Sequence, residues 1–275
     1  MVEEQGCAMQ LDIQGKRMMN RFFLTIFAFL LSADAGVAQT LDQLSITVVY
    51  LRQDNRIGTG FLIADSNSAY LVTAKHVASF LKPESVGTVG DSNYVPYSFS
   101  LADVTPQSPT LDWKFHQEAD IALLRLLLHG KAGEQLSGRF IPLGMIEQKL
   151  TPPQRKRPLV AMGFPLALGT RIHFSPITSE SKAASGLVRI KPDSLEPEQT
   201  FFLLDKPSIG GFSGAPVFLM PWPYSDSPAL TMPEYGTRAQ CVGIVKGTIS
   251  DDTGGKLAAI VPVYYVLETI RSNFK

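Results

Sequence analysis

The sequence GGFSGAP at residues 210–216 places one serine, Ser213, among small residues and directly before the apolar run PVFLM at 216–220. Glycine lets a backbone come close to a bound group and adopt dihedral angles that a β-carbon would forbid. A serine in this setting is either part of a tight structural turn or a nucleophile with backbone amide donors around it. The stretch alone leaves both interpretations open, so the choice depends on the rest of the chain.

The composition indicates a globular protein rich in β-structure. The chain has 275 residues, of which 45% are hydrophobic and 18% charged, with 22 Gly and 19 Pro. This length suffices for one large domain or two small ones. Basic and acidic residues both number 25, so the formal net charge is zero. Because there is no long basic run or basic stripe, nothing indicates a nucleic-acid partner.

The N-terminus is typical of a secretory leader. Basic residues at 16–21 precede the ten-residue run FFLTIFAFLL at 22–31, and small residues follow, with cleavage expected after Ala38 or Ala35. The apolar run is shorter than the roughly 20 residues that a membrane-spanning helix needs, which favours cleavage over a retained anchor. We therefore expect residues 1–38 to be a signal peptide with an upstream extension. The mature protein would be exported, periplasmic or extracellular, without stable membrane association.

Cysteine usage agrees with a core that holds together without disulfides. Cleavage after Ala38 would remove Cys7 and leave one cysteine, Cys241, in a mature chain of 275 − 38 = 237 residues. A single cysteine allows no internal disulfide, so the core alone must stabilise the fold. Cys241 precedes the run VGIV at 242–245 and is interpreted as a buried small hydrophobe.

Short β-branched and apolar runs, separated by Gly, Pro, Asn and Asp, predict about six strands in each half of the chain. Apolar residues at helical spacing predict a terminal helix over 264–273. Residues 83–114 and 221–240 are expected to be proline-containing loops. The expected strands cover 44–51, 58–64, 70–74 and 120–126, then 159–165, 183–190, 200–204, 241–249 and 257–263, and 141–143 closes the first half.

This pattern predicts an all-β protein of two tandem six-stranded β-barrels with a short C-terminal helix. The N-terminal barrel would span 39–150, and the C-terminal barrel with the terminal helix would span 159–275. The polar, proline-rich sequence TPPQRKRP at 151–158 is the expected linker. Its three basic residues are interpreted as solvated.

Three residues could together make a nucleophilic site. A serine hydroxyl needs an adjacent base, and the base needs an orienting acid. His76 ends an expected strand in the first half, Asp120 opens another strand there, and Ser213 lies in the second half. A site between two barrels would bring them together.

The segments LVTAKHV at 71–77, DIALLRL at 120–126 and GFSGAP at 211–216 resemble the histidine, aspartate and serine signatures of chymotrypsin-like (trypsin-like) serine peptidases. Their order and their spacings, 120 − 76 = 44 and 213 − 120 = 93 residues, suit that family. GTGF at 58–61 and MGFP at 162–165 are similar to the bacterial, disulfide-free branch of HtrA-like and glutamyl-endopeptidase-like enzymes. The resemblance spans nearly the whole mature chain, and we expect no PDZ domain after the catalytic part.

The resemblance implies a secreted serine endopeptidase that acts on polypeptides through a covalent acyl-enzyme, with no metal and no cofactor. His76 would serve as general base and then as general acid, Asp120 would orient it, and Ser213 would attack the carbonyl. Backbone amides of Gly211 and Ser213 would form the oxyanion hole. The resemblance gives no oligomeric state.

The resemblance also implies a primary specificity pocket lined by Pro207, Ser208, Lys246, Gly247, Thr248 and Ala259. The position that selects basic side chains in the family holds Pro207 rather than an acid. This favours an apolar or small side chain before the cleaved bond, although Lys246 leaves an acidic preference open.

Two positions depart from the family pattern. Phe212 stands where digestive members carry an acid that pairs with a freed N-terminus, so local packing would have to hold the oxyanion loop. Lys246 falls where a small polar residue often supports the catalytic aspartate.

Other functions fit the chain less well. An α/β-hydrolase needs its histidine after the serine, whereas all four histidines precede Ser213, namely His76, His116, His129 and His173. No two of them have metal-ligand spacing, so the last three are interpreted as structural. The remaining alternative is a catalytically weak or inactive peptidase-fold binding module in the cell envelope.

Overall fold

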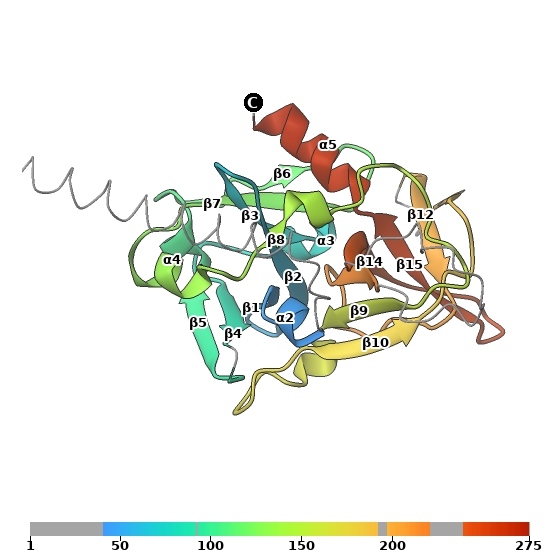
Figure 1. Ribbon diagram of the computed structural model, residues 1–275, viewed down its shortest axis with the longest axis horizontal. Helices are drawn as coiled ribbons and strands as arrows, with labels where there is room; N and C mark the ends of the chain where they lie inside the picture. Colours follow the sequence, from blue (N-terminus) through green and yellow to red (C-terminus); the bar gives the residue numbers. More distant parts are fainter. Residues whose placement is uncertain (1–40, 92, 192–196, 221–238, 275) are drawn as a thin grey trace, which may run out of the picture.

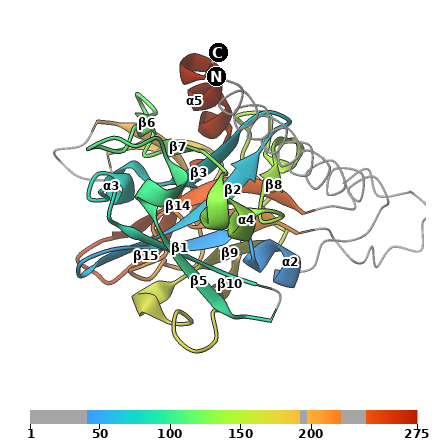
Figure 2. The ribbon, with the colours of Figure 1, turned by 90° about the vertical axis from the view of Figure 1, so that its left-hand side faces the viewer.

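The computed structural model describes residues 41–91, 93–191, 197–220 and 239–274. Two β-sheets lie side by side, and the C-terminal helix α5 (Tyr264–Asn273) lies at one end of the molecule in both views (Figures 1 and 2). The predicted signal peptide, 1–38, and most of the loop predicted at 221–240 lie outside the described residues. Within the described residues, no helix is both long and apolar enough to cross a membrane.

The first sheet has eight strands in the order β5-β4-β1-β2-β3-β7-β6, with β8 pairing in parallel with β2. Its other pairs are antiparallel. The strands are β1 (Val48–Gln53), β2 (Arg56–Ala64), β3 (Ala69–Thr73), β4 (Val86–Gly90), β5 (Pro96–Ser100), β6 (Lys114–Phe115), β7 (Ala122–Leu126) and β8 (Ile141–Pro142). The helices in this half are α2 (Leu41–Ser45), α3 (Lys75–Ala78), α4 (Gly130–Leu136) and the short η2 (Leu101–Val104) and η3 (Leu143–Met145).

The second sheet has seven antiparallel strands in the order β10-β9-β13-β14-β15-β12-β11. Residues 146–158, which join the two sheets, contain no helix or strand. The predicted domain boundaries and the 151–158 linker stay a prediction. The elements of this half are β9 (Leu159–Gly163), η4 (Pro165–Ala167), β10 (Ile177–Ser181), β11 (Val188–Ile190), β12 (Gln199–Leu204), β13 (Pro216–Leu219), β14 (Gln240–Ser250) and β15 (Lys256–Pro262).

The predicted class, an all-β protein with a short C-terminal helix, is confirmed as two consecutive β-sheets and that helix, but strand number and closure differ. Among the described residues, the sheets have eight and seven strands rather than six each, and they run along open paths instead of closed rings. Part of the excess comes from 83–114, predicted to be a loop, which contains β4, β5 and the first residue of β6. Pro96 misled that prediction because proline is tolerated as the first residue of an edge strand, where β5 places it.

Three local predictions also differ from the structure. Leu44, expected to begin a strand, lies in α2, and β1 begins only at Val48. Strand β10 was missed because its sequence ITSES is buried only at its last residue and therefore carries no apolar run. Of the strand expected over 183–190, only Val188–Ile190 forms one.

One apolar cluster joins the two sheets and fixes their relative position. It contains Phe61 and Tyr70 of the first sheet together with Met162 and Phe218 of the second, all almost fully buried. Each such side chain stabilises the fold by about 1.5–3 kcal/mol on burial. Cys241 belongs to the same cluster, and burial raises the pKa of its thiol to about 12, so it behaves as the small hydrophobe expected.

Candidate active site

The pairing of β3 with β7 brings His76 and Asp120 to the same end of the first sheet. These antiparallel strands end their register at the pair Thr73↔Ala122. His76 follows Thr73 by three residues, inside α3, and Asp120 precedes Ala122 by two residues. Antiparallel pairing therefore carries both side chains past the same strand end.

His76 and Asp120 make two hydrogen bonds. The imidazole Nδ1 lies 2.6 Å from Asp120 Oδ2, and the backbone N–H of His76 donates to Asp120 Oδ1 at 2.9 Å. The amides of the first helical turn have no partner inside the helix, which leaves the His76 N–H free for the carboxylate. A carboxylate at Nδ1 favours the tautomer protonated there, so Nε2 is left as a proton acceptor.

Asp120 is held in its ionised form. Burial alone would raise the pKa of this carboxyl, whose side chain is only 4% exposed. The hydrogen bond and charge of His76, followed by the charge of Lys246, outweigh burial, and the pKa lies below its ordinary value. The carboxylate can therefore orient the imidazole and stabilise a positive charge on it.

The loop that carries Ser213 leaves two backbone amides without an acceptor among the described residues. The carbonyl of Gly210 accepts from Leu166 N at 2.8 Å, and the carbonyl of Phe212 accepts from Ala215 N at 2.8 Å. In a trans peptide the N–H points opposite to the preceding carbonyl, and no described peptide is cis. The amides of Gly211 and Ser213 therefore face the other way, and neither has an acceptor among the described residues.

Two glycines make this loop possible. Gly214 has φ +86°, and a β-carbon there would lie 2.0 Å from the carbonyl oxygen of Thr59 and 3.1 Å from the amide nitrogen of Ala74. Gly211 has φ +104°, and its β-carbon would lie 2.3 Å from the carbonyl oxygen of Phe164. Both conformations favour glycine. Because Gly214 lies close to Ala74, Ser213 lies near the end of β3, a few residues before His76.

Thr59 of β2 ties the serine loop to the first sheet and was not predicted to have a role. Its backbone N–H donates to the Ser213 carbonyl at 2.8 Å, and its Oγ1 donates to the Gly211 carbonyl at 2.7 Å. Its own carbonyl accepts from Thr73 Oγ1 at 2.7 Å. The segment GTGF at 58–61 contributed to the family resemblance, but nothing in it indicated which residues Thr59 would contact.

Phe212 anchors the loop on its other side, as its position in the sequence led us to expect. Its side chain is 3% exposed and belongs to an apolar cluster with Ala215, Val217 and Val245. Local packing therefore holds the segment that carries the free amides, without an ion pair to a processed N-terminus.

A family model described as a trypsin-like peptidase domain matches residues 58–221, more than half of the chain. The chain belongs to the trypsin-like peptidase family. The matched region contains His76, Asp120 and Ser213 and the loops described above. A comparison with curated protein sequences gave no match.

Solved structures share the fold of this trypsin-like peptidase. An inactive form of Rv3671c from M. tuberculosis H37Rv is 15% identical, with a TM-score of 0.52 over 84% of this chain and 87% of that chain. The MamO protease domain from Magnetospirillum magneticum is 16% identical, with a TM-score of 0.50 over 82% and 96%. The HtrA-type protease AlgW with a tripeptide is 14% identical, with a TM-score of 0.52 over 84% and 62%. These likenesses confirm the predicted chymotrypsin-like fold and resemblance.

In this trypsin-like peptidase, the hydroxyl of the candidate nucleophile is hydrogen-bonded to a backbone carbonyl instead of to the candidate base. The hydroxyl of Ser213 donates to the carbonyl oxygen of Lys246 at 3.1 Å. Among the described residues, no hydrogen bond joins it to His76, whose side chain is 40% exposed. Catalytic hydrogen bonds are often long or absent without substrate, so this geometry leaves the candidate in place.

Lys246 directs its ammonium group at Asp120. Its Nζ lies 3.4 Å from Asp120 Oδ2, and the side chain is 14% exposed. The position where the family often carries a small polar residue thus supplies a cation, which has a carboxylate partner within the protein.

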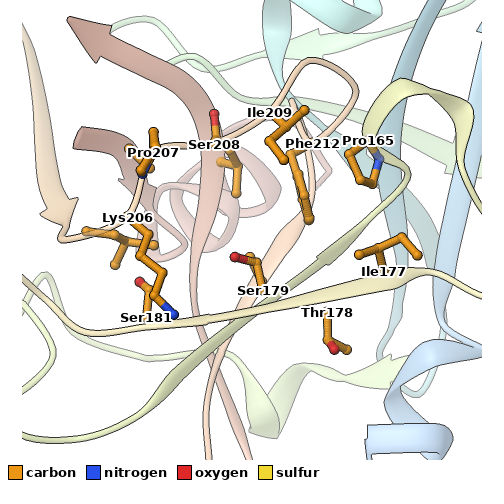
Figure 3. A pocket seen from close by; sticks show the side chains of 14 residues that line it. Pro165, Ile177, Thr178, Ser179, Ser181, Lys206, Pro207, Ser208, Ile209 and Phe212 are labelled. Atoms are coloured by element: carbon orange, nitrogen blue, oxygen red, sulfur yellow. The ribbon is translucent and has the colours of Figure 1, made fainter. Parts of the chain in front are cut away.

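The other predicted pocket residues divide between two places. Thr248 Oγ1 donates to the Ser208 carbonyl at 2.7 Å and lies 3.1 Å from the Ser208 hydroxyl, so the two expected walls touch. A cavity of about 160 Å³ lies next to Ser208 (Figure 3). Residues 206–209 and Phe212 line one wall of this cavity, and strand β10 lines another. Pro207 and Ser208 line this cavity, whereas Lys246, Gly247, Thr248 and Ala259 do not. The pocket assignment of these six residues stays a prediction.

Among the other histidines, His116 has a structural role. Nδ1 of His116 accepts from the amides of Glu118 and Ala119 at 3.1 and 3.0 Å, and this orders the turn before Asp120. In the described part of the chain, no group of three or more His, Cys, Asp or Glu side chains is placed to hold a metal ion. A buried hydroxyl, Ser181 Oγ, lines the cavity of Figure 3 without a hydrogen-bond partner among the described residues.

Proposed function

We propose that this protein is an exported serine endopeptidase that hydrolyses polypeptides through a covalent acyl-enzyme on Ser213. The observation that carries the proposal is the arrangement where the two sheets meet. A hydrogen-bonded His76–Asp120 pair lies beside a serine whose loop leaves two backbone amides without acceptors. A base with an orienting acid, a nucleophile and amide donors are the parts that acyl transfer requires.

The proposed reaction uses each part in turn. Ser213 Oγ attacks the carbonyl carbon of the scissile bond while His76 Nε2 accepts the hydroxyl proton, and Asp120 stabilises the imidazolium. The amides of Gly211 and Ser213 donate to the developing oxyanion, and each such donor contributes about 3 kcal/mol. The imidazolium then protonates the leaving amine, and water hydrolyses the resulting ester by the reverse roles. Before attack, the Ser213 hydroxyl has to leave the Lys246 carbonyl and turn toward His76.

A fluorophosphonate probe tests the nucleophile directly, because it phosphonylates only an activated serine. The mature protein is expected to be labelled at Ser213 and to cleave casein, and the Ser213→Ala variant to do neither. The matched control is Ser272→Ala, which removes an exposed hydroxyl on α5. Absence of both labelling and casein cleavage between pH 6 and 9 would overturn the proposal.

A catalytically weak or inactive binding module is the second candidate. The bond from Ser213 to the Lys246 carbonyl and the lysine beside Asp120 favour it. The same probe separates the two candidates, because a binding module would retain a peptide on a column without labelling or cleavage.

The substrate preference and the export route belong to the proposal as well. We expect an apolar or small side chain before the cleaved bond, since Pro207 supplies no charge and Lys246 is engaged with Asp120. Cleavage-site profiling on a peptide library tests this preference, and a dominant acidic or basic residue would contradict it. For export, intact-mass measurement of the secreted protein should show loss of residues 1–38.

A further inference from the structure

Lys246 places a second cation next to the proposed catalytic pair. Its Nζ lies 3.4 Å from Asp120 Oδ2, the same oxygen that lies 2.6 Å from His76 Nδ1. The ammonium nitrogen and the imidazole nitrogen are therefore at most about 6.0 Å apart, the sum of these two distances. Lys246 is largely shielded from water, with 14% of its side chain exposed.

This cation opposes a charge that forms in the transition state. The imidazole gains a positive charge when it accepts the Ser213 proton in the proposed step, and the ammonium group repels that charge. Once the proton has moved, two positive charges lie within about 6 Å of each other. At an effective dielectric constant of about 20, that repulsion would slow the step about a hundredfold. Because His76 is 40% exposed, water and salt reduce the effect, and about tenfold is expected.

Asp120 keeps its place without Lys246, and His76 does more than Lys246 to lower the pKa of its carboxyl. His76 supplies one hydrogen bond to each carboxylate oxygen, at 2.9 and 2.6 Å. The contact of Lys246 with Ser213 runs through the lysine backbone carbonyl, which a side-chain substitution keeps. A neutral side chain at this position would therefore keep the two hydrogen bonds of Asp120 and the hydrogen bond of the Ser213 hydroxyl, and it would remove the repulsion between the ammonium group and the imidazolium.

We propose that Lys246 is an electrostatic brake on the triad, a side chain that slows acyl transfer to Ser213 by opposing the positive charge that forms on His76. This inference rests on the proposed peptidase function and concerns regulation of the same site.

The test compares substitutions that keep or remove the charge. Lys246→Met retains a long apolar stem without the ammonium group and is expected to raise kcat and the rate of fluorophosphonate labelling about tenfold, with KM changed less than twofold. Lys246→Arg keeps the charge and should show no gain. Lys256→Met, at an exposed lysine at the start of β15, is the matched control and should leave both rates unchanged.

The outcomes separate this inference from the proposed function. A labelled parent protein with a Met variant that is no faster, at an unchanged thermal midpoint, would overturn the brake and leave the peptidase function standing. If Lys246→Met fails to fold, Lys246→Gln takes its place under the same expectation. Absence of labelling and cleavage in the parent and in every variant would overturn the peptidase function and the brake together. A lysine that only stabilised the fold would lower rate and thermal midpoint in the neutral variant, and not raise the rate.

Discussion

The two sides of the proposed site are built differently. On the first sheet, strand pairing positions His76 and Asp120, and two hydrogen bonds of 2.6 and 2.9 Å lock them together. On the second sheet, Ser213 sits in a loop whose hydroxyl is bonded to a backbone carbonyl and not to the base. The acid–base pair is thus ready before substrate arrives, whereas the nucleophile still has to turn.

The difference extends to what each side needs from the rest of the fold. The acid–base pair depends on one strand register and a few polar atoms, so a substitution there should change rate more than stability. The serine loop depends on glycines at positive φ and on bonds from Thr59, so a substitution there should change both. The predictions below test this contrast.

The largest effect is expected from Asp120→Asn. Asp120 accepts from His76 with both carboxylate oxygens, whereas asparagine has one acceptor oxygen. With that oxygen on the His76 backbone N–H, the amide NH2 faces Nδ1, so the wrong tautomer is favoured and kcat should fall about 10⁴-fold. KM and the circular dichroism spectrum should stay near those of the parent. Turnover within tenfold of the parent would show that Asp120 is not the orienting acid.

Gly214→Ala should destabilise the protein by about 2–5 kcal/mol, because it combines a strained positive φ with a steric clash. The added β-carbon would lie 2.0 Å from the Thr59 carbonyl oxygen. Urea denaturation measures the loss, and activity should fall with it. Gly186→Ala is the matched control, since Gly186 has no neighbour within 4 Å of a β-carbon and no positive φ, and it should change stability by less than about 0.5 kcal/mol. Equal effects of the two variants would contradict the role given to Gly214.

Thr59→Val should cost about 1–3 kcal/mol, because the buried Gly211 carbonyl loses the donor that lies at 2.7 Å. Since the same bond holds the loop that presents the Gly211 amide, kcat should fall more than KM changes. Thr110→Val, at an exposed threonine, serves as the control. An unchanged kcat would show that Thr59 supports the fold without supporting the amide donors.

The smallest expected effect is on acid stability. Because the pKa of Asp120 is lower in the folded protein than its ordinary value of 3.8, the ionised form stabilises the fold. This contribution is fully present well above pH 3.8 and is lost as the pH falls below that value through the folded pKa. Urea midpoints measured from pH 6 to pH 2 should therefore fall less steeply for Asp120→Asn than for the parent. Parallel curves would contradict this.

The sequence predicted the elements whose signal is local. Apolar runs such as FLIA and LLRL predict buried strands. Because His76, Asp120 and Ser213 lie within or beside such runs, their approximate places could be predicted. Strand β10 escaped because ITSES is mostly exposed, and β5 escaped because it begins with Pro96. Edge strands obtain their order from pairing, which the sequence of a single segment does not contain.

The parts of the candidate site that escaped prediction depend on contacts between distant residues. Thr59 and Gly211 are 152 positions apart, and only the packing of the two sheets brings them within a hydrogen bond. The direction of the Lys246 side chain toward Asp120 likewise depends on a contact between the two halves, because Lys246 belongs to β14 and Asp120 lies two residues before β7. Residue type alone could not distinguish a substrate-binding lysine from one that faces the acid.

The two hydrogen bonds from Thr59 to the serine loop have a consequence for how such a protein could be divided. The amide donors sit in the second half of the chain, yet the first half holds their loop in shape through Thr59. A fragment containing only the second half would carry the serine without a competent oxyanion loop, even if it folded. Cutting the chain between residues 151 and 158 should therefore give two inactive fragments, and peptidase activity should return only when they reassociate. A functional oxyanion loop would then require the contacts between the two halves. A chimera that exchanges halves between relatives would have to preserve the hydrogen bonds from Thr59 to the serine loop.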